Sequence, residues 1–184
     1  ELAAKAEGLT YPNPMVGAIV VKNGKIIANA YHRRPGGLHA EAIALKRAGK
    51  IAKGAELYIN LEPCAHVGRT PPCVRAIIKS GIKKVFCSMI DPNPLNNGRG
   101  KRELETSGVK VIVGILDKEA RELNKVFIKY VTKKMPFVIV KAAQSLDGKI
   151  ATKTMDSKWI TTDASRDYSH RLRSEMDAVL VGVN

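Results

Sequence analysis

Two short stretches of the sequence carry side chains that can bind a metal ion and move protons. Residues 39–41 read His-Ala-Glu, and residues 62–73 read EPCAHVGRTPPC, in which Cys64 and Cys73 each follow a proline. One imidazole and two thiolates make three protein ligands, the number typical of a catalytic zinc site whose fourth position is left to water. Glu41 lies two residues from His39, close enough to take a proton from that water and pass it to a leaving group. We predict one zinc ion held by His39, Cys64 and Cys73, with Glu41 as the catalytic proton shuttle.

The cysteine count agrees with free thiols. The chain has three cysteines in 184 residues, an odd number that argues against a disulfide scaffold and for a reducing compartment. Cys87, in the middle of the predicted strand KVFCSMI, is expected to be a buried apolar residue. No apolar run approaches the roughly 20 residues of a membrane helix, and the first residues lack the features of a signal peptide. We expect a cytoplasmic protein without membrane contact.

The charge leaves three interpretations open. A net charge of +14 fits a solvated basic surface, a small anionic ligand such as a phosphorylated substrate or a nucleotide cofactor, or a nucleic acid. The basic residues are spread along the chain rather than gathered in one tail. The aromatic content of 5% is low for base stacking, which counts against nucleic acid.

Regular alternation of strands and helices is predicted over the first 115 residues. Asn23-Gly24 between two β-branched runs is a strong hairpin signal. The predicted elements are the hairpin strands 15–21 and 25–30, helix 40–49, strand 56–61, helix 72–81, strand 84–90, helix 99–108 and strand 109–114. This order predicts a three-layer α/β/α sandwich. A long amphipathic helix over 117–134 should follow, with Asp117 as its N-cap.

These elements should bring the proposed zinc ligands together. His39 and Cys73 each stand at the start of a predicted helix, and Cys64 follows the end of a predicted strand. In α/β sheets, sites form where the carboxyl ends of strands meet the amino ends of helices. A helix N-terminus also stabilises the thiolate, which is the form that binds metal.

A second unit is predicted from residue 135 onward. Met135-Pro136 ends the long helix. A strand over 136–143, a loop, a helix over 162–176 capped by Thr162 or Asp163, and a strand over 178–182 should follow. We therefore expect two domains, 1–134 and 135–184. A single β-α-β piece cannot bury both faces of a sheet, so we expect the chain to be the front part of a longer protein.

His-Ala-Glu followed by Pro-Cys and a second Cys is typical of zinc-dependent nucleobase deaminases, in which a metal-activated water displaces ammonia. The eight-residue insert between Cys64 and Cys73 is longer than the two-residue spacing of most of them. The insert resembles that of the bifunctional riboflavin-biosynthesis deaminase/reductases, and the resemblance covers nearly the whole chain. Its blocks are YPNPMVGAIVV, GGLHAEAIAL, LYINLEPCAHVGRTPPC, DPNP, KAAQSLDGKIAT, SKWIT and HRLRSEMDAVLVG.

The resemblance implies a cytidine-deaminase-like domain followed by the start of a dihydrofolate-reductase-like domain. It also implies hydrolysis of the 2-amino group of 2,5-diamino-6-(5-phosphoribosylamino)pyrimidin-4-one. NADPH-dependent reduction of the ribosyl group to ribityl should follow, in a protein that forms homo-oligomers and binds no nucleic acid.

The resemblance further implies roles for individual residues. Asn13 would contact the pyrimidine. The ribose phosphate would be held by His66, Arg69, Asp91 and Asn93, where the Arg69 guanidinium matches a phosphate well. In the second unit, NADPH would contact Ala143 and Trp159, and the sugar phosphate would contact Ser157 and Arg173.

One block departs from the family pattern. After DPNP the family usually has an apolar residue and then a Gly-Lys-Gly run, whereas this chain reads LNNGRG, with Asn96 and Arg99.

Two alternatives stay open. A deaminase acting on tRNA or another nucleic acid would suit the charge, but not the long insert or the second unit. A purely structural zinc in a basic RNA-binding module would need a fourth protein ligand, which is not evident, and would leave Glu41 without a role.

Overall fold

The computed structural model describes residues 1–182. It divides the chain into two compact units, Glu1–Phe137 and Val138–Asn184, which are described separately below. The predicted domain boundary between 134 and 135 stays a prediction.

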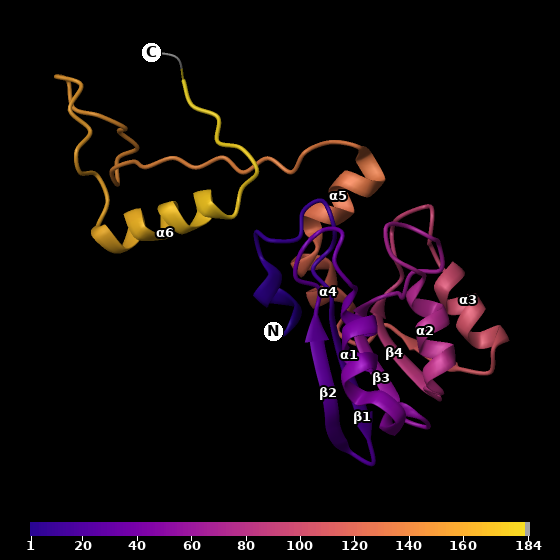
Figure 1. Cartoon of the computed structure of the whole chain (residues 1–184). Helices are drawn as coiled ribbons and strands as arrows, with labels where there is room; N and C mark the ends of the chain where they lie inside the picture. Colours follow the sequence, from indigo (N-terminus) through magenta and orange to yellow (C-terminus); the bar gives the residue numbers. More distant parts are fainter. Residues whose placement is uncertain (183–184) are drawn as a thin grey trace. The chain divides into compact units, whose positions relative to one another are not determined.

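The first unit is built on a five-stranded mixed sheet (Figure 1). Its strands are β1 (Gly17–Lys22), β2 (Lys25–Tyr31), β3 (Glu56–Leu61), β4 (Lys84–Met89) and β5 (Lys110–Val113). The strand order is β2-β1-β3-β4-β5, with β1 antiparallel to both neighbours and β3, β4 and β5 parallel. Asn23 and Gly24 join β1 to β2 with φ angles of 50° and 74°, the pair of positive angles that the tight hairpin turn requires.

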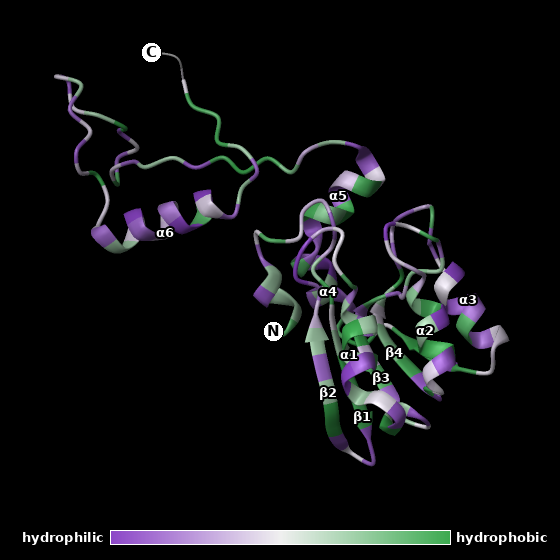
Figure 2. Ribbon diagram, viewed as in Figure 1, coloured by the Kyte–Doolittle hydropathy of each residue, from purple (hydrophilic) through white to green (hydrophobic). Residues whose placement is uncertain are grey.

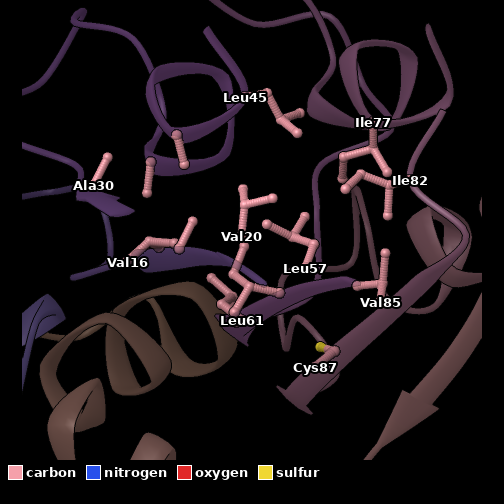
Figure 3. Packing of buried hydrophobic residues seen from close by; sticks show 14 of the residues in the cluster. Val16, Val20, Ala30, Leu45, Leu57, Leu61, Ile77, Ile82, Val85 and Cys87 are labelled. Atoms are coloured by element: carbon pink, nitrogen blue, oxygen red, sulfur yellow. The ribbon is translucent and has the colours of Figure 1, made fainter. Parts of the chain in front are cut away.

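Helices cover both faces of this sheet. They are α1 (Ala40–Ala48), α2 (Cys73–Ser80), α3 (Arg99–Thr106), α4 (Asp117–Leu123) and α5 (Lys125–Lys133), with 3-10 turns at Ala3–Ala6 and Gly49–Ala52. Leu45 of α1 and Ile77 of α2 lie on one side of the strands, over Val20 and Leu57 (Figure 3). The α4 helix packs against β3 and β4 from the opposite face. The predicted three-layer α/β/α sandwich is confirmed.

Alternation along the strands explains the core. In β3 and β4 every second residue is buried and the others are half-buried, as expected of strands whose two faces are covered unequally. Cys87 is buried at 1% exposure within this core, as predicted (Figure 3). The parallel strands direct their carboxyl ends toward one edge of the sheet, where the loops after β3 and β4 begin.

The prediction of one long helix over 117–134 is wrong, because the chain breaks at Asn124 into α4 and α5. Asn124 is buried, and its side chain accepts from Met15 N at 2.8 Å and donates to Met15 O at 3.0 Å. Asp117 is not the N-cap either. Leu116 occupies that position, and the Asp117 carboxylate instead accepts from Arg121 Nε at 2.7 Å within the helix.

The second unit contains the predicted helix, α6 (Asp163–Ser174), and Thr162 caps it by accepting from Ser165 N. The residues of α6 are mostly hydrophilic, and none of them is buried (Figure 2). The strands predicted at 136–143 and 178–182 are not formed within the described residues. A strand needs a neighbour to pair its backbone groups, and neither segment has one in this unit.

Candidate metal centre

The two cysteines and the histidine converge at the edge where the parallel strands end. Cys64 follows β3, Cys73 begins α2 and His39 is the N-cap residue of α1. His39 Nδ1 lies 3.5 Å from Cys64 Sγ and 3.3 Å from Cys73 Sγ. All three ligand atoms lie within 4.8 Å of one another.

This spacing fits zinc. Tetrahedral zinc with Zn–S bonds of about 2.3 Å and a Zn–N bond of about 2.0–2.1 Å sets a nitrogen and a sulfur ligand about 3.6 Å apart. The nitrogen–sulfur distances here agree with that separation, and no disulfide joins the thiols. The donor set and its geometry therefore suit a zinc ion with three protein ligands.

The surroundings of Cys64 favour its thiolate. The pKa of Cys64 is lowered, chiefly by hydrogen bonding from the Cys73 thiol and then from His39. Cys73 N, at the start of α2, also donates to Cys64 Sγ at 3.3 Å. The pKa of Cys73 is raised by the same contact with Cys64 and by burial. Contact with Cys64 also raises the pKa of His39.

Glu41 is buried on the first turn of α1, at 3% exposure. Burial raises the pKa of its carboxyl, because the charged form loses its hydration. The place of Glu41 beside the three metal-binding side chains is the one predicted for it, and its role as a proton shuttle stays a prediction.

A cavity of about 360 Å³ opens beside these groups. It is lined by every residue predicted for the first unit's site except Cys73: Asn13, His39, Glu41, Cys64, His66, Arg69, Asp91 and Asn93. The structure thus gathers residues that are spread over 81 positions of sequence, from 13 to 93. Their individual roles stay predictions.

Two of the lining side chains, His66 and Asp91, carry polar atoms that are buried in the cavity wall. His66 Nδ1 is buried and has no hydrogen-bond partner. The pKa of Asp91 is raised to about 6, mainly by burial, although Asn93 N donates to its carboxylate at 2.9 Å.

Sequence reasoning missed His32 and Thr70. His32 is buried, lies 3.0 Å from Asn13 Nδ2 through Nε2, and sets its ring edge-on to that of His39. Burial lowers the pKa of His32, because the charged imidazolium would lose its hydration. Thr70 Oγ1 lies 3.3 Å from His39 Nε2 and so helps to orient that ring. Thr70 lies inside the quoted insert, and His32 stands next to two arginines, but nothing in their spacing marks either residue.

The loop after β4, residues 91–98, is fastened to the loop that carries Cys64. The buried Glu62 carboxylate accepts from the backbone nitrogens of Asp91 at 3.0 Å, Gly98 at 2.9 Å and Lys101 at 2.9 Å. Asn96 donates to Pro63 O at 3.2 Å and accepts from Ala65 N at 2.9 Å. Glu62 stands in the quoted motif. A charged residue directly after the predicted strand 56–61 is the sequence signal that could have marked it.

The structure does not bring the four predicted residues of the second unit into contact. Ala143 is half-buried, and Ser157, Trp159 and Arg173 are exposed. The ring of Trp159 instead packs under the Arg166 guanidinium, 4.4 Å from the ring centroid. Within residues 138–182 these four positions share no hydrogen bond or ring contact.

No helix of the described chain combines the length and the apolar character needed to cross a bilayer.

A three-layer α/β/α sandwich that carries a His-Cys-Cys group beside a buried glutamate is typical of the zinc-dependent deaminases. The family model of the cytidine and deoxycytidylate deaminase zinc-binding region matches residues 1–89, and that of the RibD C-terminal domain matches residues 136–184.

Curated relatives match this chain over nearly its whole length. The riboflavin biosynthesis protein RibD of Aquifex aeolicus is 56% identical over 183 residues, which cover 100% of this chain and 51% of the relative. RibD of Escherichia coli is 44% identical over 98% of this chain and 49% of the relative. The chain is thus similar to these riboflavin biosynthesis proteins over nearly all of its residues, and it spans about half the length of the curated relatives it matches.

Two solved structures of similar proteins have a similar fold. RibD of Acinetobacter baumannii superposes with a TM-score of 0.90 at 44% identity, over 95% of this chain and 49% of that one. The diaminohydroxyphosphoribosylaminopyrimidine deaminase/5-amino-6-(5-phosphoribosylamino)uracil reductase of Thermotoga maritima superposes with a TM-score of 0.87 at 49% identity, over 94% of this chain and 50% of that one.

Proposed function

We propose that the first unit hydrolyses the 2-amino group of 2,5-diamino-6-(5-phosphoribosylamino)pyrimidin-4-one and releases ammonia. The observation that carries this proposal is the buried Glu41, which lines the same cavity as His39 and Cys64 of the His39-Cys64-Cys73 group. Residues 1–134 would form this deaminase domain.

The proposed chemistry divides between the metal and the chain. His39, Cys64 and Cys73 would hold zinc, which when bound polarises water and makes it nucleophilic near neutral pH. Glu41 would accept a proton from the attacking water and donate it to the leaving amino group. Its raised pKa suits both transfers, since the same carboxyl must be deprotonated first and protonated afterwards.

The cavity supports a phosphorylated substrate. The unpartnered His66 Nδ1 supplies a polar group for the ligand, and the Arg69 guanidinium lines the same cavity. Asp91 and Asn93 on the opposite loop would hold the ribose through hydrogen bonds, and Asn13 would read the pyrimidine edge. A cationic group and directional polar groups together suit a phosphoribosyl compound better than a free base.

Residues 135–184 would contribute to an NADPH-dependent reductase that converts the ribosyl group to ribityl. Ala143 and Trp159 would contact NADPH, and Ser157 and Arg173 would contact the sugar phosphate. We further propose a homo-oligomer in the cytoplasm, where a reducing environment keeps the three cysteines free.

The test measures ammonia release from the diaminopyrimidine ribosyl phosphate, with bound zinc quantified in the same samples. We expect about one zinc per chain and turnover in the unaltered protein. Glu41→Gln should keep its zinc and lose about 10²–10⁴-fold in kcat, the usual contribution of a general acid–base group. Glu105→Gln, on the exposed side of α3, should change neither.

Glu41→Gln with full turnover would remove the proposed role of Glu41. Zinc binding without turnover of this substrate, but with deamination of a short RNA, would favour the nucleic-acid alternative.

A further inference from the structure

Asn96 lies at a point where the proposed substrate loop touches the proposed metal ligand. It is fully buried, at 0% exposure, although it belongs to a loop of mostly exposed or half-buried residues. A buried amide is costly unless its polar atoms are hydrogen-bonded, so its two partners explain why it is tolerated there.

Those two partners are the peptide groups on either side of Cys64. Asn96 Nδ2 donates to Pro63 O at 3.2 Å, and Asn96 Oδ1 accepts from Ala65 N at 2.9 Å. The Cys64 carbonyl itself accepts from Val74 N at 3.3 Å. One side chain therefore holds both flanks of the cysteine, while α2 holds its carbonyl.

The other end of this connection is the loop that lines the cavity. Asn96 N donates to Asn93 O at 2.9 Å, and Asn93 N donates to the Asp91 carboxylate at 2.9 Å. A continuous set of hydrogen bonds thus runs from two cavity-lining residues to the backbone of Cys64.

We propose that Asn96 is a positioning residue that fixes the backbone of Cys64 and so holds the metal ligand in place. This inference rests on the proposed function, because it takes His39, Cys64 and Cys73 as the zinc ligands.

The test compares zinc release in Asn96→Val and in Asn97→Val. Valine is apolar and can make neither hydrogen bond. Asn97 is the exposed neighbour of the same type and serves as the matched control. The full chain is loaded with one zinc, mixed with excess of the chromogenic chelator 4-(2-pyridylazo)resorcinol, and followed at 25 °C.

Asn96→Val should release zinc about tenfold faster than the unaltered chain, since groups that orient metal ligands contribute about 10–100-fold in metal affinity. Asn97→Val should release it at the unaltered rate. Equal rates for Asn96→Val and the unaltered chain would overturn the inference, whatever the melting temperature does. If Asn96→Val does not fold, Asn96→Thr, whose hydroxyl can keep one of the two bonds, decides by the same comparison.

Steady-state kinetics separate positioning from a general loss of stability. A displaced Cys64 should lower kcat of the zinc-loaded protein at saturating substrate, whereas simple destabilisation at 25 °C should leave kcat per folded molecule unchanged. Failure of the proposed function has a different outcome, since an unaltered chain that takes up no zinc would remove the metal centre and this inference with it.

Discussion

Glu62 offers the sharpest test of how the site is held together. Its carboxylate is 4% exposed and accepts three backbone N–H groups, from Asp91, Gly98 and Lys101. Hydrogen bonds to a charged group contribute about 2 kcal/mol each, and neutral ones about 1 kcal/mol. In Glu62→Gln the amide nitrogen must replace one oxygen, so at least one N–H faces another donor and the remaining bonds become neutral.

The expected loss is about 4 kcal/mol in the free energy of unfolding, from one bond removed and two weakened. With a urea dependence of about 2 kcal/mol per M, the unfolding midpoint should fall by about 2 M. The measurement is urea denaturation of the metal-free chain at neutral pH, followed by circular dichroism. Glu105→Gln, whose exposed carboxylate pairs with Lys101 at 3.5 Å, should leave the midpoint nearly unchanged. A shift below about 0.5 M for Glu62→Gln would refute the reasoning.

Three further predictions concern packing, pH and metal removal. A Cβ on Gly100 would clash with the backbone carbonyl oxygen of Pro63, so Gly100→Ala should lower the free energy of unfolding by about 1–3 kcal/mol or more. Gly68→Ala, with open space around the added Cβ, should leave the free energy of unfolding unchanged. The urea midpoints of the two variants and of the unaltered chain make the comparison. Because the pKa of Asp91 is raised to about 6 in the folded chain, the unfolded chain ionises first as pH rises, and stability falls between about pH 4 and pH 6. Relative to Asp91→Asn, the unaltered chain should lose about 3 kcal/mol over that range, and parallel curves from denaturation at each pH would contradict this assignment. Chelating the zinc should expose Cys64 to a thiol reagent while Cys87, buried and with its pKa raised to about 12, stays unreactive; unchanged Cys64 labelling by mass spectrometry would argue against Cys64 as a ligand.

Local patterns predicted the first unit well because each of its elements has a local cause. The hairpin follows from Asn23-Gly24, and α2 begins after Pro72 and ends at Gly81, whose φ of 74° is the left-handed C-cap. The gathering of the zinc ligands follows from a general rule about strand and helix ends. Such features need no knowledge of distant contacts.

The failures have tertiary causes. The break at Asn124 is made by hydrogen bonds to Met15, 109 residues earlier, which no helical periodicity reveals. The missing strands of the second unit show the converse, since a β-branched run such as that at 136–143 becomes a strand only beside a partner. The same limit applies to the site, because no local pattern shows that Asn96 bonds to the loop of Cys64, about 30 residues earlier.

The bond between Asn124 and Met15 also has a consequence for biosynthesis. The chain is made from its amino end at about 5–20 residues per second, so on the order of 10 s separates the synthesis of these two positions. During that interval Met15 can already accept from Asn60 Nδ2, at 2.8 Å, but its two hydrogen bonds to Asn124 cannot form. The ribosome therefore delivers all three proposed zinc ligands before the link between Met15 and Asn124 can form.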